Sequence, residues 1–221
     1  VINLEHLVYH EAPIVVSSDD LVCLRPFGPA VGHTTMPDEV VEAFNDDIDG
    51  GTAGPDWSGR LVGKVTEERL IPTDVLEPHK MFFTNAALRY VSNYASRYCR
   101  PIADDIRPQV TIQSAWYVRQ GPGDFNPIHL HTNAELSCIG YLQMPDGIED
   151  DQDHYPAHGH VEFMHGSPTF LNRASFMVRP KPGDFFIFPA DMYHTVYPFK
   201  SEGERRSFSM NIILSEKEDD D

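Results

Sequence analysis

The sequence predicts a mainly β protein, a double-stranded β-helix (jelly roll), with helices packed on the outside of its sheets. Helical periodicity is confined to the first hundred residues, whereas the rest of the chain alternates short β-rich runs with turn clusters. In addition, two histidine-containing segments far apart in the chain can meet only if strands fold back on one another. A jelly roll provides that arrangement.

The N-terminal region contains two helical patterns. The first begins at Met36-Pro37-Asp38-Glu39, because an early proline and acids in the first turn are typical of a helix start. Apolar residues then recur at helical spacing until two glycines end the run: Val40, Val41, Phe44, Ile48, then Gly50 and Gly51. A second helix is expected to begin at Thr84 and to end before Pro101. One of its faces is apolar: Ala87, Leu88, Val91, Ala95 and Tyr98.

From about residue 109 the pattern becomes that of strands. Runs rich in Val, Ile, Phe, Tyr and Thr are separated by clusters of Gly, Pro, Asn and Asp. The aromatic residues in these runs are interpreted as core. Seven strands are predicted: Gln109–Arg119, Leu136–Gln143, His160–Met164, Ser175–Val178, Asp184–Phe188, His194–Tyr197 and Ser207–Leu214.

One domain is expected over residues 1–221, since no internal repeat or low-complexity linker interrupts the chain. Within it, residues 1–108 form a helix-containing support region and residues 109–214 form the jelly-roll core. Residues 215–221 form an acidic tail, which is typical of a solvated chain end.

Composition excludes several classes of partner. The formal net charge is -17, with 17 Lys and Arg against 34 Asp and Glu, so nucleic acid and anionic membrane are poor partners. No apolar run is long enough to cross a bilayer, and the first ten residues lack a signal-peptide pattern. Three widely spaced cysteines favour a reducing compartment. A cytoplasmic location is therefore expected.

Two segments carry the strongest chemical signal. Gly123 precedes His129-Leu-His131, and alternate residues of a strand point the same way, so both histidines can face one metal. Downstream, Gly183 and Pro189 precede His194. A close histidine pair can arise by chance in a chain with eleven histidines. The matching glycine context of the two segments nevertheless favours a metal site.

The two segments resemble the two motifs of the cupins. In that family, glycine, His-x-His and a glutamate are followed by glycine, proline and a further histidine. The resemblance implies a metal site with four ligands, including Glu135. Here Asp191 and Pro198 replace the glycine and asparagine that usually occupy the second motif.

A further motif distinguishes a second family. Arg205 follows His194 by eleven residues, and Ser207 shares its strand face. A guanidinium offers a planar fork for a carboxylate. Together with Tyr141, these residues resemble the 2-oxoglutarate/Fe(II)-dependent oxygenases, in particular a group found in marine bacteria and phages and the related prolyl hydroxylases. The likeness is strongest over His129 to Tyr141 and Phe188 to Asn211.

This resemblance implies a function. Fe(II), 2-oxoglutarate and O2 would be used to hydroxylate a peptidyl or small-molecule substrate, with release of succinate and CO2. Arg205, Ser207 and Tyr141 would hold the distal end of the co-substrate. The protein would act in a bacterial or phage-infected cell, with a homodimer as one possible assembly.

The sequence departs from the family pattern at one ligand. Oxygenases of this type use two histidines and one carboxylate, but His131 stands where the carboxylate belongs. His131 could bind the metal itself, Glu135 could supply the carboxylate, or two histidines and an anion could suffice. We favour His131. A second cluster, running from His154 to His165, is interpreted as a polar loop rather than a second metal site.

Two other functions are compatible with these residues. A cupin enzyme that does not use 2-oxoglutarate would bind its metal with Glu135 and leave Arg205 without a role. A non-catalytic jelly-roll binding protein would use the histidines only as structural residues.

Overall fold

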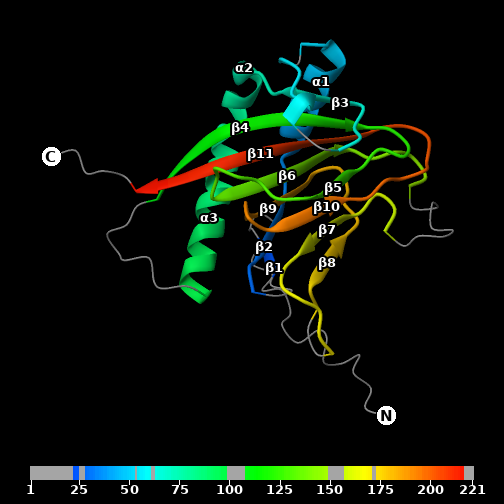
Figure 1. The fold of residues 1–221 in the computed structure, drawn as a ribbon. Helices are drawn as coiled ribbons and strands as arrows, with labels where there is room; N and C mark the ends of the chain where they lie inside the picture. Colours follow the sequence, from blue (N-terminus) through cyan, green and yellow to red (C-terminus); the bar gives the residue numbers. More distant parts are fainter. Residues whose placement is uncertain are drawn as a thin grey trace.

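Two antiparallel β-sheets form the body of the protein (Figure 1). The computed structural model describes residues 22–24, 28–52, 54–60, 63–98, 108–148, 157–170 and 173–216. The larger sheet has seven strands in the order β1-β2-β9-β6-β11-β4-β3, and the smaller has four in the order β5-β10-β7-β8. The architecture is the predicted mainly β jelly roll.

The strands of the larger sheet are β1 (Val22–Leu24), β2 (Val31–Thr35), β3 (Glu67–Leu70), β4 (Pro108–Gln120), β6 (Leu136–Gln143), β9 (Asp184–Pro189) and β11 (Arg205–Glu216). Those of the smaller sheet are β5 (Asn126–His129), β7 (Val161–Met164), β8 (Ser175–Val178) and β10 (Tyr193–Val196). The helices are α1 (Asp38–Gly50), α2 (Thr73–Leu76) and α3 (Lys80–Tyr98), with short 3-10 turns η2 (Ser58–Arg60) and η3 (Glu77–His79).

All seven predicted strands are present, with their ends shifted by at most two residues. Three further strands, β1, β2 and β3, were not predicted, and β5 was expected only as the strand that carries the His129-Leu-His131 motif. β3 has the sequence Glu-Glu-Arg-Leu, and β5 contains a proline, so neither carries the usual strand signal. Helix α3 begins at Lys80 rather than at the predicted Thr84.

The helices pack on the outer face of the larger sheet, as predicted. The ring of Phe208, in β11, lies at the centre of this core. Its centroid is 5.2 Å from that of Phe44 in α1 and 5.7 Å from that of Phe83 in α3. Burial of such aromatic clusters is the main source of stability in a domain of this size. The outer core therefore fixes α1 and α3 against the sheet.

The inner faces of the two sheets form a second core. Phe163 of β7 packs against Phe186 and Phe188 of β9, with centroid distances of 6.0 and 4.9 Å. Side chains of β11 alternate between the two cores, since Phe208 and Met210 pack among the outer-core residues whereas Ser207 pairs with inward-facing Tyr141. The polar residues of β11 thus enter the space between the sheets.

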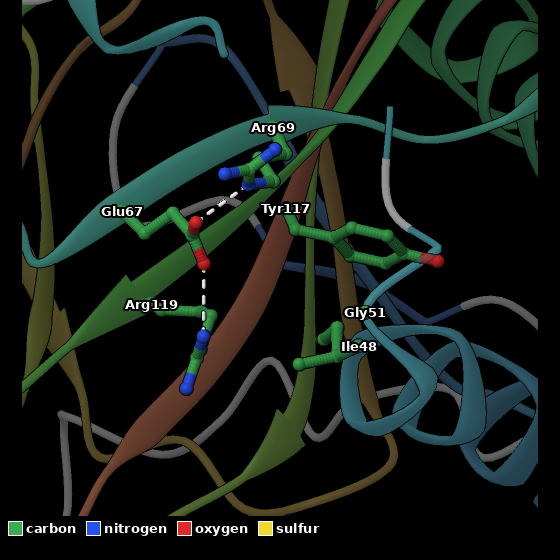
Figure 2. Close-up of a pocket in the computed structure, with 6 residues that line it drawn as sticks. All are labelled: Ile48, Gly51, Glu67, Arg69, Tyr117 and Arg119. Atoms are coloured by element: carbon green, nitrogen blue, oxygen red, sulfur yellow. Dashed lines mark hydrogen bonds and ion pairs between the residues drawn. The ribbon is translucent and has the colours of Figure 1, made fainter. Parts of the chain in front are cut away.

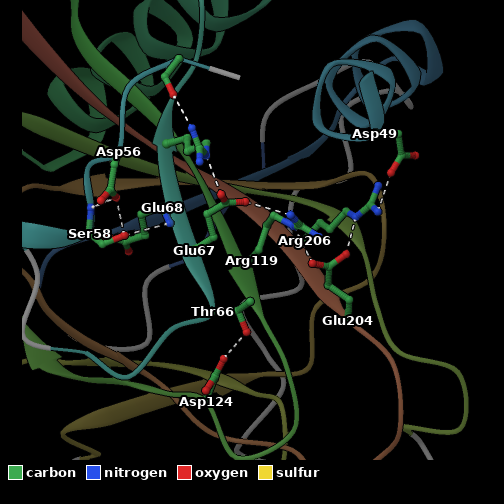
Figure 3. A network of polar contacts seen from close by, with 12 residues as sticks. Asp49, Asp56, Ser58, Thr66, Glu67, Glu68, Arg119, Asp124, Glu204 and Arg206 are labelled. Atoms are coloured by element: carbon green, nitrogen blue, oxygen red, sulfur yellow. Dashed lines mark hydrogen bonds and ion pairs between the residues drawn. The ribbon is translucent and has the colours of Figure 1, made fainter. Parts of the chain in front are cut away.

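An ion-pair network joins α1 to the outer face of the sheet (Figure 3). Arg206 binds Glu204 and Asp49 at 2.8 and 2.7 Å. Arg119 binds Glu204 at 2.6 Å and Glu67 at 2.8 Å. A small cavity of about 200 Å³, which Glu67, Arg119 and Tyr117 help to line, lies on this side of the sheet (Figure 2).

None of the described helices is both long and apolar enough to cross a membrane.

Close packing around Phe208 leads to a stability prediction. A Cβ added at Gly140 would overlap the Phe208 ring, so Gly140→Ala should lower the free energy of unfolding by about 1–3 kcal/mol. Gly59→Ala is the matched control, because a Cβ there meets no atom within 4 Å. Urea unfolding would measure both variants. Equal stability of Gly140→Ala and the unchanged protein would contradict this packing.

Candidate metal centre

Three histidines from two loop-separated segments meet between the sheets. His129, the last residue of β5, is the cross-strand partner of His194 in β10. His131 lies two residues beyond the end of β5 rather than on the strand as predicted. Its backbone N–H donates to the carbonyl of Ala190 at 2.8 Å, which holds it beside β10. One ligand nitrogen from each histidine lies within 4.8 Å of the other two.

Each imidazole is oriented through its Nδ1 atom. His129 Nδ1 lies 2.7 Å from the carbonyl oxygen of Pro127, and His194 Nδ1 lies 3.0 Å from that of Met192. His131 Nδ1 lies 2.6 Å from Oδ1 of Asn211. A carbonyl oxygen can only accept, so Nδ1 carries the proton and Nε2 keeps its lone pair. In metal-binding histidines, the ring nitrogen that does not bind the metal typically makes a hydrogen bond of this kind.

The cluster is electrically neutral. Burial lowers the pKa of His129, and it lowers the pKa of His131 to about 4. The pKa of His194 is held well below its usual value by burial and by the two neighbouring histidines. Three neutral imidazoles with converging lone pairs suit a divalent transition metal and leave open positions for other ligands.

The structure does not bring the predicted fourth ligand, Glu135, to this cluster. Glu135 is exposed, and its carboxylate accepts a hydrogen bond from the backbone N–H of Leu214 at 2.8 Å. After His131 the chain leads away from the histidines, so Glu135 lies at the surface beside β11. The four-ligand arrangement expected from the cupin resemblance is therefore not formed.

An open cavity of about 450 Å³ adjoins the histidines. Trp57, Trp116, His129 and His131 are among its walls. The Trp116 ring stacks on His131, with centroids 5.7 Å apart and an interplanar angle of 24°. The cavity gives a bound molecule access to two of the three histidines.

Arg205 lies at the opposite end of the inner face and is fully buried. Its Nε and Nη2 donate to Oε1 of Gln120 at 3.1 and 2.9 Å. Nη1 donates to the carbonyl of Gly159 at 3.1 Å, and the guanidinium lies 5.3 Å from the Phe199 ring centroid. Burial lowers the pKa of Arg205 to about 10. Its neighbour Arg206 faces the outer network, so the two arginines occupy opposite faces.

Two donors beside Arg205 have no partner in the structure. The Tyr141 hydroxyl and the Nε2 amide of Gln120 are both buried without a hydrogen bond. Ser207, next to Tyr141 across the strand pair, is also buried. Burial is the main cause that raises the pKa of Tyr141, so its hydroxyl keeps its proton and can donate. A buried donor without an acceptor is costly, and the oxygen atoms of an anion could accept hydrogen bonds from both donors.

The sequence did not identify Gln120, Trp57 or Asn211 as site residues. Gln120 could have been found from register, because it pairs with Arg205 across the β4–β11 ladder. Trp57 lies in a loop that carries no strand or helix signal. Of the His154–His165 cluster, His154 lies outside the described residues. Within the part of the chain that the structure describes, no second group of potential metal ligands occurs.

Comparisons with known proteins place these features in context. The family model described as "Putative 2OG-Fe(II) oxygenase" matches residues 114–211, which include all three histidines. That family uses Fe(II), 2-oxoglutarate and O2. Among the curated proteins, no significant sequence match was found.

Several solved structures share the fold. The non-heme alpha ketoglutarate dependent carbocyclase SnoK from nogalamycin biosynthesis has a TM-score of 0.58 at 11% identity, covering 87% of this chain and 83% of its own. The epimerase SnoN from the same biosynthesis has a TM-score of 0.56 at 12% identity, covering 86% and 77%. A Pseudomonas putida prolyl-4-hydroxylase has a TM-score of 0.54 at 14% identity, covering 83% and 91%. At these identities the likeness shows the fold alone.

The geometry predicts how metal binding responds to substitution. His194→Ala should lower the affinity for Fe(II), or for the redox-inert substitute Mn²⁺, at least 100-fold, because it removes a ligand from a three-ligand site. His131→Ala should have an effect of similar size. Glu135→Gln is the control and should retain the metal. Isothermal titration with Mn²⁺ would measure all three, and full affinity in His194→Ala would show that the metal binds elsewhere.

Proposed function

We propose that this chain, which belongs to the 2OG-Fe(II) oxygenase family through residues 114–211, hydroxylates an organic substrate while it converts 2-oxoglutarate and O2 to succinate and CO2. His129, His131 and His194 would hold the iron. The observation that supports the proposal is the neutral histidine cluster on the same inner face as Arg205 and the buried, unpaired donors of Tyr141 and Gln120.

The cluster fits a ferrous ion. Fe(II) accepts imidazole nitrogen, and a facial set of three protein ligands leaves positions for a chelating keto acid and for O2. No described carboxylate belongs to the cluster, so the ion would keep its full positive charge. That charge strengthens the attraction for a dianionic co-substrate. A three-histidine site is thus suited to 2-oxoglutarate although it lacks the usual acidic ligand.

The other end of the co-substrate would lie near Arg205. The Tyr141 hydroxyl and the Gln120 amide can each donate one hydrogen bond to a carboxylate. Arg205 would supply the compensating charge, and Gln120 links it to the carboxylate because Oε1 of the same side chain accepts from the guanidinium. Ser207 would add a further hydroxyl on this face.

Different residues of the chain would have different roles in the reaction. The bound iron supplies the activation of O2 that oxidises a C–H bond. Asn211 and the backbone carbonyls hold the imidazoles in the tautomer that leaves Nε2 free. Tyr141, Gln120 and Arg205 orient the co-substrate. Trp57 and Trp116 form the wall against which the substrate is positioned, and such positioning is a major part of enzymatic rate enhancement.

The direct test is co-substrate turnover. Protein loaded with Fe(II) should convert 2-oxoglutarate to succinate in the presence of O2, slowly without substrate and faster with a compound that it hydroxylates. Metabolite and peptide pools would be screened for that stimulation by mass spectrometry. His194→Ala protein is the control for free iron. Lack of succinate above this control, in protein shown to bind the metal, would reject the proposal.

Tyr141→Phe provides a sharper test of the co-substrate region. The variant removes a hydroxyl that has no partner in the protein, so the fold and the metal affinity should be unchanged. The affinity for 2-oxoglutarate should fall about 10- to 100-fold, as expected for a lost hydrogen bond to a charged group.

Tyr117→Phe is the matched control. Its hydroxyl is also buried, but it lies beside Asp47, and the residue packs in the outer core on the other face of the sheet. Calorimetric titration of manganese-loaded protein with 2-oxoglutarate would compare the two variants. An equal loss in both, or a loss only in Tyr117→Phe, would place the co-substrate elsewhere.

A further inference from the structure

Two neighbouring glutamates of β3 lie on opposite faces of the larger sheet. Glu67 faces outward and binds Arg69 at 2.5 Å and Arg119 at 2.8 Å (Figure 3). Glu68 faces inward and is completely buried. Glu67 is therefore a paired surface charge, whereas the burial of Glu68 needs a different explanation.

Glu68 has no partner for either carboxylate oxygen. Its main chain is satisfied, because its N–H donates to Ser58 Oγ at 3.3 Å and its carbonyl accepts from Trp57 N–H at 2.8 Å. The fold therefore uses the main chain of Glu68 but neither oxygen of its carboxyl group. Leaving a buried carboxyl unpaired is energetically costly. Such a group is retained most readily where a ligand supplies the missing partner.

Glu68 lies beside the cavity that adjoins the metal centre. Its cross-strand partner is Val118, and the next inward residue of the strand, Leu70, pairs with Trp116. Trp57, whose N–H binds the Glu68 carbonyl, and Trp116 both line the cavity, with ring centroids 6.5 Å apart. The indole N–H of Trp116 is also buried without a partner. The two indoles form one wall of the cavity, and Glu68, which is buried and does not itself line the cavity, occupies the inward position of β3 next to them.

The charges around this wall favour a cation. Among the described residues, Asp56 is the charged group whose field acts on Glu68, and it adds to burial in raising the pKa of Glu68 to about 7. No Lys or Arg lines the cavity within the described chain. The histidines beside it are neutral at pH 7. Nothing on this side of the site therefore compensates an ionised Glu68.

We propose that Glu68, Trp57 and Trp116 form a substrate subsite that binds a positively charged nitrogen. The carboxylate would pair with the cation, and the indole faces would stabilise it through cation–π contacts. The inference rests on the proposed function, because it assigns the bound cation to the substrate that the oxygenase would oxidise. It identifies the substrate class as a compound with an amine, guanidine or quaternary ammonium group.

The subsite predicts a particular pH dependence. Only ionised Glu68 pairs with a cation, and in the free protein the pKa of this carboxyl is about 7. Affinity should therefore be constant above pH 8 and should fall as the pH drops below 7, approaching roughly tenfold per pH unit. A guanidinium probe keeps its charge across this range. A pH dependence of the affinity would consequently arise from the protein and not from the probe.

The two tryptophans of the cavity are the only tryptophans of the chain, so intrinsic fluorescence reports directly on the subsite. Zinc-loaded protein with bound 2-oxoglutarate would be titrated with Nα-acetyl-L-argininamide. Nα-acetyl-L-citrullinamide serves as the neutral probe of nearly the same shape. We expect a saturable fluorescence change with the first probe and at least tenfold weaker binding of the second.

Glu68→Gln should weaken binding of the arginine probe about 10- to 100-fold and remove its pH dependence. Glu67→Gln is the matched control, since it removes the same charge from the adjacent residue on the outer face, and it should bind the probe normally. Equal binding of the two probes, or unchanged affinity in Glu68→Gln, would overturn the proposal.

The same titration on metal-free protein separates this inference from the proposed function. Cation binding without metal or 2-oxoglutarate binding would support the subsite and reject the oxygenase. Normal metal and 2-oxoglutarate binding without any preference for the cationic probe would support the oxygenase and reject the subsite.

Discussion

The alternation of side chains along β11 determines both the helix packing and the composition of the site. This strand lies between β4 and β6, and its residues point in turn to the helices and to the space between the sheets. Phe208 anchors the outer core, while Arg205 and Asn211 enter the site. A shift of register by one residue would exchange the two sets. The packing of α1 and α3 on Phe208 therefore also fixes the chemical identity of the inner face.

That inner face carries polar groups that the protein itself does not satisfy. Tyr141 and Gln120 offer donors near Arg205, whereas Glu68 offers an acceptor near the tryptophans. Donors in one region and an acceptor in another are complementary to two different ligands, an anion and a cation. The histidine cluster lies on the same inner face, and its lone pairs require a cation of their own. Binding of an anion and a cation at the two proposed sites would offset the energetic cost of these unpaired groups.

Much of this arrangement could be predicted from the sequence because its signals are local. Runs of β-favouring residues between turn clusters predicted seven strands, and the glycine context around His129 and His194 indicated that two distant segments meet. The alternation rule also placed Arg205 and Ser207 on one strand face, as the structure has them. Each of these inferences needed only the residues within one element and a general rule of geometry.

The features of the fold and the site that the sequence did not predict depend on contacts between elements. Glu135 was a candidate ligand because of its spacing, but the chain carries it to the surface beside Leu214. β3 is highly charged, and only its pairing with β4 reveals that Glu67 and Glu68 have different surroundings. Gln120 becomes a site residue only through its bonds to Arg205. Such tertiary pairings leave no periodic signal in the sequence.

The neutral three-histidine site should bind Fe(II), and 2-oxoglutarate should chelate this iron. Anaerobic titration of the Fe(II)-loaded protein with 2-oxoglutarate, followed by visible absorption, would measure the chelation itself. We expect a saturable charge-transfer band that is absent in His194→Ala and that requires higher co-substrate concentrations in Tyr141→Phe. Absence of the band in the unchanged protein, with iron demonstrably bound, would show that 2-oxoglutarate does not bind at these histidines.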